Sequence, residues 1–258
     1  MHSLLRTVIA VCCLALPFSA SAAAPNLTIL ADGSLMQALA ELARVYSTQT
    51  GTPLTVVRND SADPARQLEQ GYDAHILLSA DPTLVERLAQ RGLIDVFGTQ
   101  TFASTQLALI APERMQSKLA VVQRISFAAI LFSQPELPIY VNDATTMGGL
   151  RAQALMEGRE FSHDLTSRAQ VKARADDIFA ALKVKDGFAL VLASTAVTEP
   201  DVAILSRLPA STSEPVRYDA VVLASESMEQ AREFTKFLKS APAQQILQHY
   251  GFQPANGD

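Results

Sequence analysis

The chain has 258 residues, which is enough for one large domain or two smaller ones with hydrophobic cores. Hydrophobic residues make up 48% and charged residues 18%, a balance typical of a globular protein. The net charge of −5 and the lack of a basic cluster argue against nucleic-acid binding.

Residues 1–22 have the pattern of a secretory signal peptide. Arg6 lies in a short positive region, Val8–Phe18 is an apolar run, and Ala20-Ser21-Ala22 has the small residues of a cleavage site. The apolar run is too short to span a bilayer. Both cysteines, Cys12 and Cys13, fall inside this leader. We therefore expect a periplasmic mature chain without disulfides or thiolate metal sites.

The stretch Asn26–Leu39 reads as a strand, a tight turn and the start of a helix. Leu27–Ala31 is apolar enough for a buried parallel strand, and Asp32-Gly33 is a turn signal. Ser34 with Gln37 fits a helix capping box. A strand followed by a helix N-terminus can hold an anion, because free N–H groups point into that crevice. The simpler interpretation is that Ser34 only caps its helix.

Two further strand–helix units follow with short loops. The strands are Pro53–Arg58 and Ala74–Ser79, and the helices are Pro64–Gln70 and Pro82–Gln90. This repetition predicts a parallel α/β sheet that binds ligands at the carboxyl ends of its strands.

The rest of the chain continues the α/β pattern less regularly. Further strands are predicted at Gln106–Ala111, Leu137–Val141, Phe188–Ala193 and Asp219–Ala224. Further helices are predicted at Leu150–Met156, Ile178–Lys185, Glu226–Lys239 and Ala241–Tyr250.

Catalytic and metal-binding patterns are missing from the sequence. His75, His163 and His249 share no metal-ligand spacing, and no Gly-x-Ser-x-Gly, Walker or dinucleotide motif occurs. Without a nucleophile–base set, we expect no enzyme, no metal and no cofactor.

Hydroxyl residues recur where strands end and helices begin. They are Ser34, Ser61, Thr145–Thr146 and Ser194–Thr195. Such neutral donors can hold a fully ionised oxyanion without a counter-charge.

Four segments together resemble the periplasmic molybdate-binding proteins of ABC transporters, within the bacterial solute-binding proteins. They are Leu27–Leu35 (LTILADGSL), Ser61–Gly71 (SADPARQLEQG), Leu78–Asp81 (LSAD) and the C-terminal Phe237–Ser240 with Tyr250–Phe252. The resemblance extends over nearly the whole mature chain.

The resemblance implies two α/β lobes joined by two crossing segments, each lobe a mainly parallel sheet flanked by helices. The first lobe would take residues 25–106 and 217–258, and the second residues 107–216. The implied function is to bind molybdate or tungstate between the lobes, as a monomer, and to deliver it to a membrane permease. Alternatives are a binding protein for another oxyanion or an organic anion, or a periplasmic enzyme or sensor partner.

The resemblance also implies ligand contacts through hydroxyl and main-chain donors. The residues at the corresponding positions are Ser34, Ser61, Gly148, Gly149 and Ile178. Molybdate would be held there by hydrogen bonds rather than as a coordinated metal ion.

Several residues depart from the family pattern. Leu192 replaces a tyrosine that touches the ligand in some members, Met147 replaces a proline, and His75 replaces an aspartate. Asp32 and Asp60 replace small residues, and their charge should weaken anion binding unless it is compensated. Arg58 ends the second strand, so we expect it to pair with Asp32 at the edge of the site.

Overall fold

The computed structural model describes residues 26–59, 64–123, 126–158 and 166–255. The predicted signal peptide with Cys12 and Cys13 lies outside these ranges, and so do Asp60, Ser61 and His163. No helix in the described ranges is both long and apolar enough to cross a membrane.

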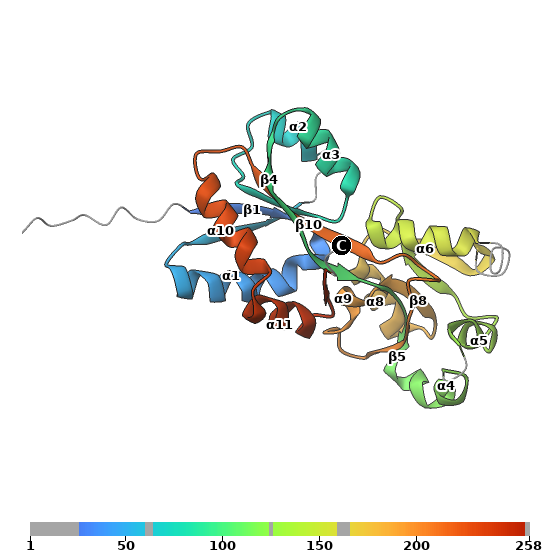
Figure 1. Ribbon diagram of the computed structural model, residues 1–258. Coiled ribbons are helices and arrows are strands. Elements are labelled where there is room, and N and C mark those ends of the chain that lie inside the picture. The colour runs from blue at the N-terminus through green and yellow to red at the C-terminus, as the bar shows by residue number, and fades with distance from the viewer. Residues whose placement is uncertain (1–25, 60–63, 124–125, 159–165, 256–258) are drawn as a thin grey trace, which may run out of the picture.

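The described chain forms two β-sheets (Figure 1). The first has the strand order β11-β4-β10-β3-β1-β2. Its strands are β1 (Leu27–Ala31), β2 (Leu54–Arg58), β3 (Ile76–Ser79), β4 (Ile94–Thr105), β10 (Val216–Leu223) and β11 (Gln253–Pro254). The second has the order β7-β6-β8-β5-β9. Its strands are β5 (Leu107–Pro112), β6 (Ile139–Asn142), β7 (Ala169–Lys172), β8 (Phe188–Leu192) and β9 (Val202–Arg207).

Both sheets are mixed, which corrects the expectation of mainly parallel sheets. In the first, β1 is parallel to β2 and β3, while β10 is antiparallel to β3 and β4. In the second, β6 is parallel to β7 and β8, while β5 is antiparallel to β8 and β9. The antiparallel strands β4, β5, β9 and β10 carry the chain from one sheet to the other and back. Unlike parallel neighbours, such strands need no helical crossover.

Helices cover both faces of the first sheet (Figure 1). They are η1 (Gly33–Leu35), α1 (Met36–Thr50), α2 (Pro64–Glu69), α3 (Pro82–Gln90), α10 (Met228–Leu238) and α11 (Ala241–His249). Leu27 and Ile29 of β1 join the core beneath α1, α10 and α11, whereas Leu30 joins the core beneath α2 and α3. Alternate strand residues point to opposite faces, so a strand buried on both faces needs a continuous apolar run.

The second sheet has its own helices and cores. The helices are η2 (Glu113–Met115), α4 (Gln116–Gln123), α5 (Phe127–Phe132), α6 (Met147–Glu157), α8 (Ala175–Val184) and α9 (Ala193–Ala196). Leu190 of β8 packs in one core and Ala189 and Val191 in the other. The protein is therefore a two-lobed α/β structure, as predicted, with one sheet in each lobe.

Candidate functional site

The parallel strands of both sheets end at the boundary between the lobes. In the first sheet, Ala31 at the end of β1 is in register with Arg58 of β2 and with Leu78 of β3. In the second, β6, β7 and β8 run parallel and lead into the loops before α6, α8 and α9. This is the edge at which α/β sheets bind ligands.

Asp32 occupies the turn after β1 and binds both polar hydrogens of Ser34. Its Oδ1 accepts from the Ser34 backbone N–H at 2.9 Å and from the Ser34 hydroxyl at 2.6 Å. Its own N–H donates to the Leu78 carbonyl at 2.9 Å, which ties the turn to β3. Asp32 is therefore the cap of η1, and α1 starts at Met36 without a side-chain cap. The predicted capping box of Ser34 with Gln37 is wrong.

Tyr218 of β10 lies on the other side of the Ser34 hydroxyl. The Tyr218 Oη is 2.7 Å from Ser34 Oγ, and the side chain is fully buried. Burial raises the pKa of this phenol well above its usual value, the charge of Asp32 adds to the rise, and the Ser34 and Ser194 hydroxyls oppose it. Tyr218 thus keeps its proton at neutral pH.

The directions of these hydrogen bonds follow from counting protons. A carboxylate only accepts, so the proton of Ser34 goes to Asp32. Tyr218 must then donate its proton to Ser34 Oγ, because no other hydrogen lies between the two oxygens. In this arrangement the Ser34 hydroxyl has no hydrogen left for a ligand.

Ser194 of the second lobe lies near the group formed by Asp32, Ser34 and Tyr218. It lies in α9, its side chain is buried, and its N–H donates to the Thr105 hydroxyl at 3.2 Å. The Ser194 Oγ is near enough to the Tyr218 phenol to affect its pKa, but among the described residues it makes no hydrogen bond of regular geometry. Thr105 ends β4, next to one of the two passages between the sheets.

The start of α6 presents main-chain donors from the second lobe. The N-cap Thr146 accepts from the Gly149 N–H at 3.0 Å, so that N–H is already used. For the Gly148 N–H, the described residues provide no partner. Gly148 packs against Leu192, because a Cβ there would lie 3.2 Å from the Leu192 Cγ. Of the two predicted glycines, the structure leaves Gly148 as the available donor.

Ile178 lies in the first turns of α8, and its side chain is fully buried. It is the fourth residue of the helix, where a backbone N–H ordinarily donates to the carbonyl of the residue before the helix. Its role as a ligand donor stays a prediction.

Arg58 lies beside the turn after β1. A Cβ on Gly33 would be only 2.8 Å from the Arg58 guanidinium, which is the flexible end of a side chain and could shift. The Asp32 carboxylate accepts hydrogen bonds from Ser34, and the Arg58 guanidinium lies close to the same turn. The expected Asp32–Arg58 ion pair stays a prediction.

Apolar side chains close the base of the boundary. Leu192 of the second lobe belongs to the same buried cluster as Leu35 of the first, and Met147 packs against that cluster. A polar contact adds to this, because the Thr198 hydroxyl donates to Gln37 Oε1. Leu192 and Met147 thus contribute to the apolar contact between the two lobes.

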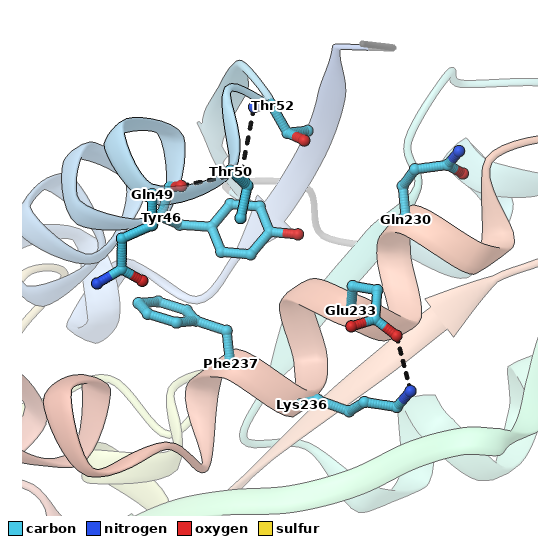
Figure 2. Close-up of a pocket in the computed structure, with 8 residues that line it drawn as sticks. All are labelled: Tyr46, Gln49, Thr50, Thr52, Gln230, Glu233, Lys236 and Phe237. Atoms are coloured by element: carbon cyan, nitrogen blue, oxygen red, sulfur yellow. Dashed lines mark hydrogen bonds and ion pairs between the residues drawn. The ribbon is translucent and has the colours of Figure 1, made fainter.

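Two hollows of the described surface lie elsewhere. The larger, of about 470 Å³, lies between α1 and α10, where Tyr46 and Phe237 form an aromatic wall and the Glu233–Lys236 ion pair lines the opposite side (Figure 2). It is at the C-terminal end of α1, a helix-length from Ser34. The smaller, of about 290 Å³, is next to Arg168.

Sequence reasoning missed Tyr218 and Thr105. The predicted strand began at Asp219, whereas β10 begins at Val216 and therefore includes the tyrosine. The available signal was chemical: a tyrosine in an apolar strand needs a partner for its hydroxyl when buried. Which partner it finds depends on the fold, because Ser34 is 184 residues away in sequence.

Comparisons with known proteins show the family of the chain and support its fold. Residues 27–253 match the sequence model of the family described as bacterial extracellular solute-binding protein. The molybdate-binding protein ModA of Escherichia coli is 23% identical over 231 residues, covering 88% of each chain. ModA of Haemophilus influenzae is 24% identical over 254 residues, covering 96% of each. The solved periplasmic molybdate-binding protein of Azotobacter vinelandii has a TM-score of 0.72 at 18% identity, over 89% of this chain and 100% of its own.

Proposed function

Because the chain belongs to the bacterial extracellular solute-binding proteins, we propose that it binds a small oxyanion between its lobes in the periplasm and passes it to an ABC permease. Molybdate or tungstate is the proposed ligand. Relatives named for molybdate binding align with 88% and 96% of the chain, which supports this choice. We propose that the protein acts as a monomer, without catalysis, cofactor or nucleic acid.

The ends of parallel strands in both lobes support the proposal, because each is followed by hydroxyl or main-chain N–H groups near the start of a helix. Ser34 follows β1 in the first lobe, and the Gly148 N–H opens α6 in the second. Met147, next to Gly148, packs against the cluster that contains Leu35, next to Ser34. A tetrahedral dianion suits such a place, because hydrogen bonds and a helix N-terminus stabilise it without a counter-charge.

Ser34, Ser61, Gly148, Gly149 and Ile178 are the proposed contacts. Among them, Gly148 has the available amide, while the amide of Gly149 is held by Thr146. Ser61 and Asp60 lie outside the described residues and stay predictions. Arg58, close to Gly33, supplies positive charge at the edge of the site.

Isothermal titration of the mature chain with molybdate, tungstate, sulfate and phosphate tests the proposal. We expect molybdate and tungstate to bind with one site per chain and more tightly than sulfate and phosphate. Molybdate and tungstate are larger than sulfate and phosphate, so the difference in affinity between the two pairs tests the size of the site. Saturable binding of an organic anion or a cationic solute, with no heat from the four oxyanions, would overturn the proposed ligand class.

A further inference from the structure

We propose that Asp32 is a specificity-determining residue that competes with the oxyanion for the donors of Ser34. This inference rests on the proposed function, because it concerns the same site. It predicts that the protein binds oxyanions less tightly than its scaffold allows, and that removing one carboxylate increases the affinity.

The competition follows from the hydrogen bonds of one oxygen atom. Asp32 Oδ1 takes the backbone N–H and the hydroxyl of Ser34, at 2.9 and 2.6 Å. These are the two donors that Ser34 could offer to an oxyanion. An anionic oxygen of this protein therefore occupies the position that an oxygen of the ligand would take.

Ser34 cannot serve both partners. It has one hydroxyl hydrogen, and the Tyr218 proton approaches Ser34 Oγ from the other side, at 2.7 Å. A ligand can receive the Ser34 hydroxyl proton only after the Asp32 side chain rotates away. The backbone of Asp32 cannot follow, because its N–H is bound to the Leu78 carbonyl. The displaced carboxylate thus stays near the ligand and repels it.

The second lobe repeats the arrangement after β6. Asp143 Oδ1 accepts from the Thr145 N–H at 2.9 Å, two residues along the chain as in Asp32-Gly33-Ser34. The N–H and the hydroxyl of Thr145 both lower the pKa of Asp143, which favours its charged form. Each lobe thus brings an acidic residue to its strand end.

Variants of Asp32 separate the lost hydrogen bonds from the lost charge. Asp32→Ala removes both the acceptor and the charge, whereas Asp32→Asn keeps an acceptor oxygen and removes only the charge. Freeing a donor for a charged ligand should raise tungstate affinity about tenfold in Asp32→Ala. Asp32→Asn should give a smaller rise, and it retains the turn if the alanine variant folds poorly.

Asp81→Ala is the matched control. Asp81 also caps a helix after a strand of the same sheet, accepting from the Thr83 N–H at 2.9 Å, and its loss changes the net charge equally. It does not bind Ser34, so its removal should change tungstate affinity by less than about twofold.

Ligand charge gives a second readout. Perrhenate is a tetrahedral monoanion of similar size to the dianion tungstate. A displaced carboxylate repels the dianion about twice as strongly. Removing Asp32 should therefore raise the affinity for tungstate more than that for perrhenate.

The titrations distinguish failure of the inference from failure of the function. If the unmutated protein binds tungstate, and both Asp32 variants bind it equally or less tightly, Asp32 is no competitor while the proposed function stands. An equal gain in Asp81→Ala would also overturn the competition, since net charge alone would then explain it. If neither the unmutated protein nor any Asp32 variant binds an oxyanion, the proposed function fails and the inference with it.

Discussion

At the scale of single residues, Tyr218 shows how burial couples folding to pH. Its hydroxyl is fully buried beside the Ser34 hydroxyl, and its pKa is raised by burial and by the negative charge of Asp32. In the unfolded chain the same phenol titrates near pH 10. Its folded pKa is higher, so its stabilising contribution is complete below about pH 10 and is lost as the pH rises further.

We therefore expect the free energy of unfolding to fall above pH 10, with Tyr218 contributing up to about 1.4 kcal/mol per pH unit. Tyr218→Phe should be less stable at pH 8, because Ser34 loses a partner, but its stability should fall less steeply above pH 10. Urea denaturation from pH 8 to 11 measures both effects. Tyr250→Phe is the comparison, because Tyr250 is only half-buried. If Tyr218→Phe keeps the full slope, the phenol is not the titrating group.

At the scale of elements, the start of α6 depends on one of its two glycines. A Cβ on Gly149 would lie 2.0 Å from the Asp143 carbonyl oxygen, and the backbone there is held by the cap of Thr146. A Cβ on Gly148 would meet the Leu192 side chain at 3.2 Å, which can adjust.

Gly149→Ala should therefore destabilise the protein by about 1–3 kcal/mol, because backbone has to move. Gly148→Ala should change stability by less than about 1 kcal/mol, since the helix propensity of alanine offsets the tighter packing. Chemical denaturation of the two variants in parallel measures the difference. Equal stabilities of the two variants would show that the backbone around Asp143 can move to accept the added Cβ without a loss of stability.

The elements that could be predicted from the sequence are those whose signals are local. β1 was found from its apolar run, and α3 from Asp81 and Pro82, which cap it as expected. β4 was missed, because much of Ile94–Thr105 is polar and only half-buried. Its partners β10 and β11 lie far away in sequence, so its pairing has no local signature.

For the candidate site, too, the features with local sequence signals could be predicted and those that depend on distant residues could not. The βα pattern predicted that Ser34 and Thr145–Thr146 lie between a strand and a helix, and they do, whereas Gly148 came from the family resemblance. The sequence did not show which hydrogen-bond donors of these residues remain unused within the protein. This depends on neighbouring side chains, some of which come from other elements. Asp32, two residues away, takes the capping role expected of Ser34, Tyr218 comes from β10, and Leu192 comes from the second lobe.

At the scale of the whole molecule, the two lobes share a core. Leu192 of the second lobe is buried with Leu35 of the first, and the chain passes twice between the sheets. The Ser194 N–H and Thr105 hydroxyl add a buried hydrogen bond close to one passage. Unfolding of either lobe would expose this shared surface, so the two should unfold together.

We expect one cooperative transition in differential scanning calorimetry, with equal calorimetric and van't Hoff enthalpies. A ligand held between the lobes should shift that whole transition. Tungstate at about 100 times its dissociation constant should add about 2.7 kcal/mol to the free energy of unfolding. For a chain of this size, this corresponds to a rise in Tm of about 5–10 °C. Two resolved transitions, with only one moved by tungstate, would mean that the lobes fold separately and that the ligand contacts only one of them.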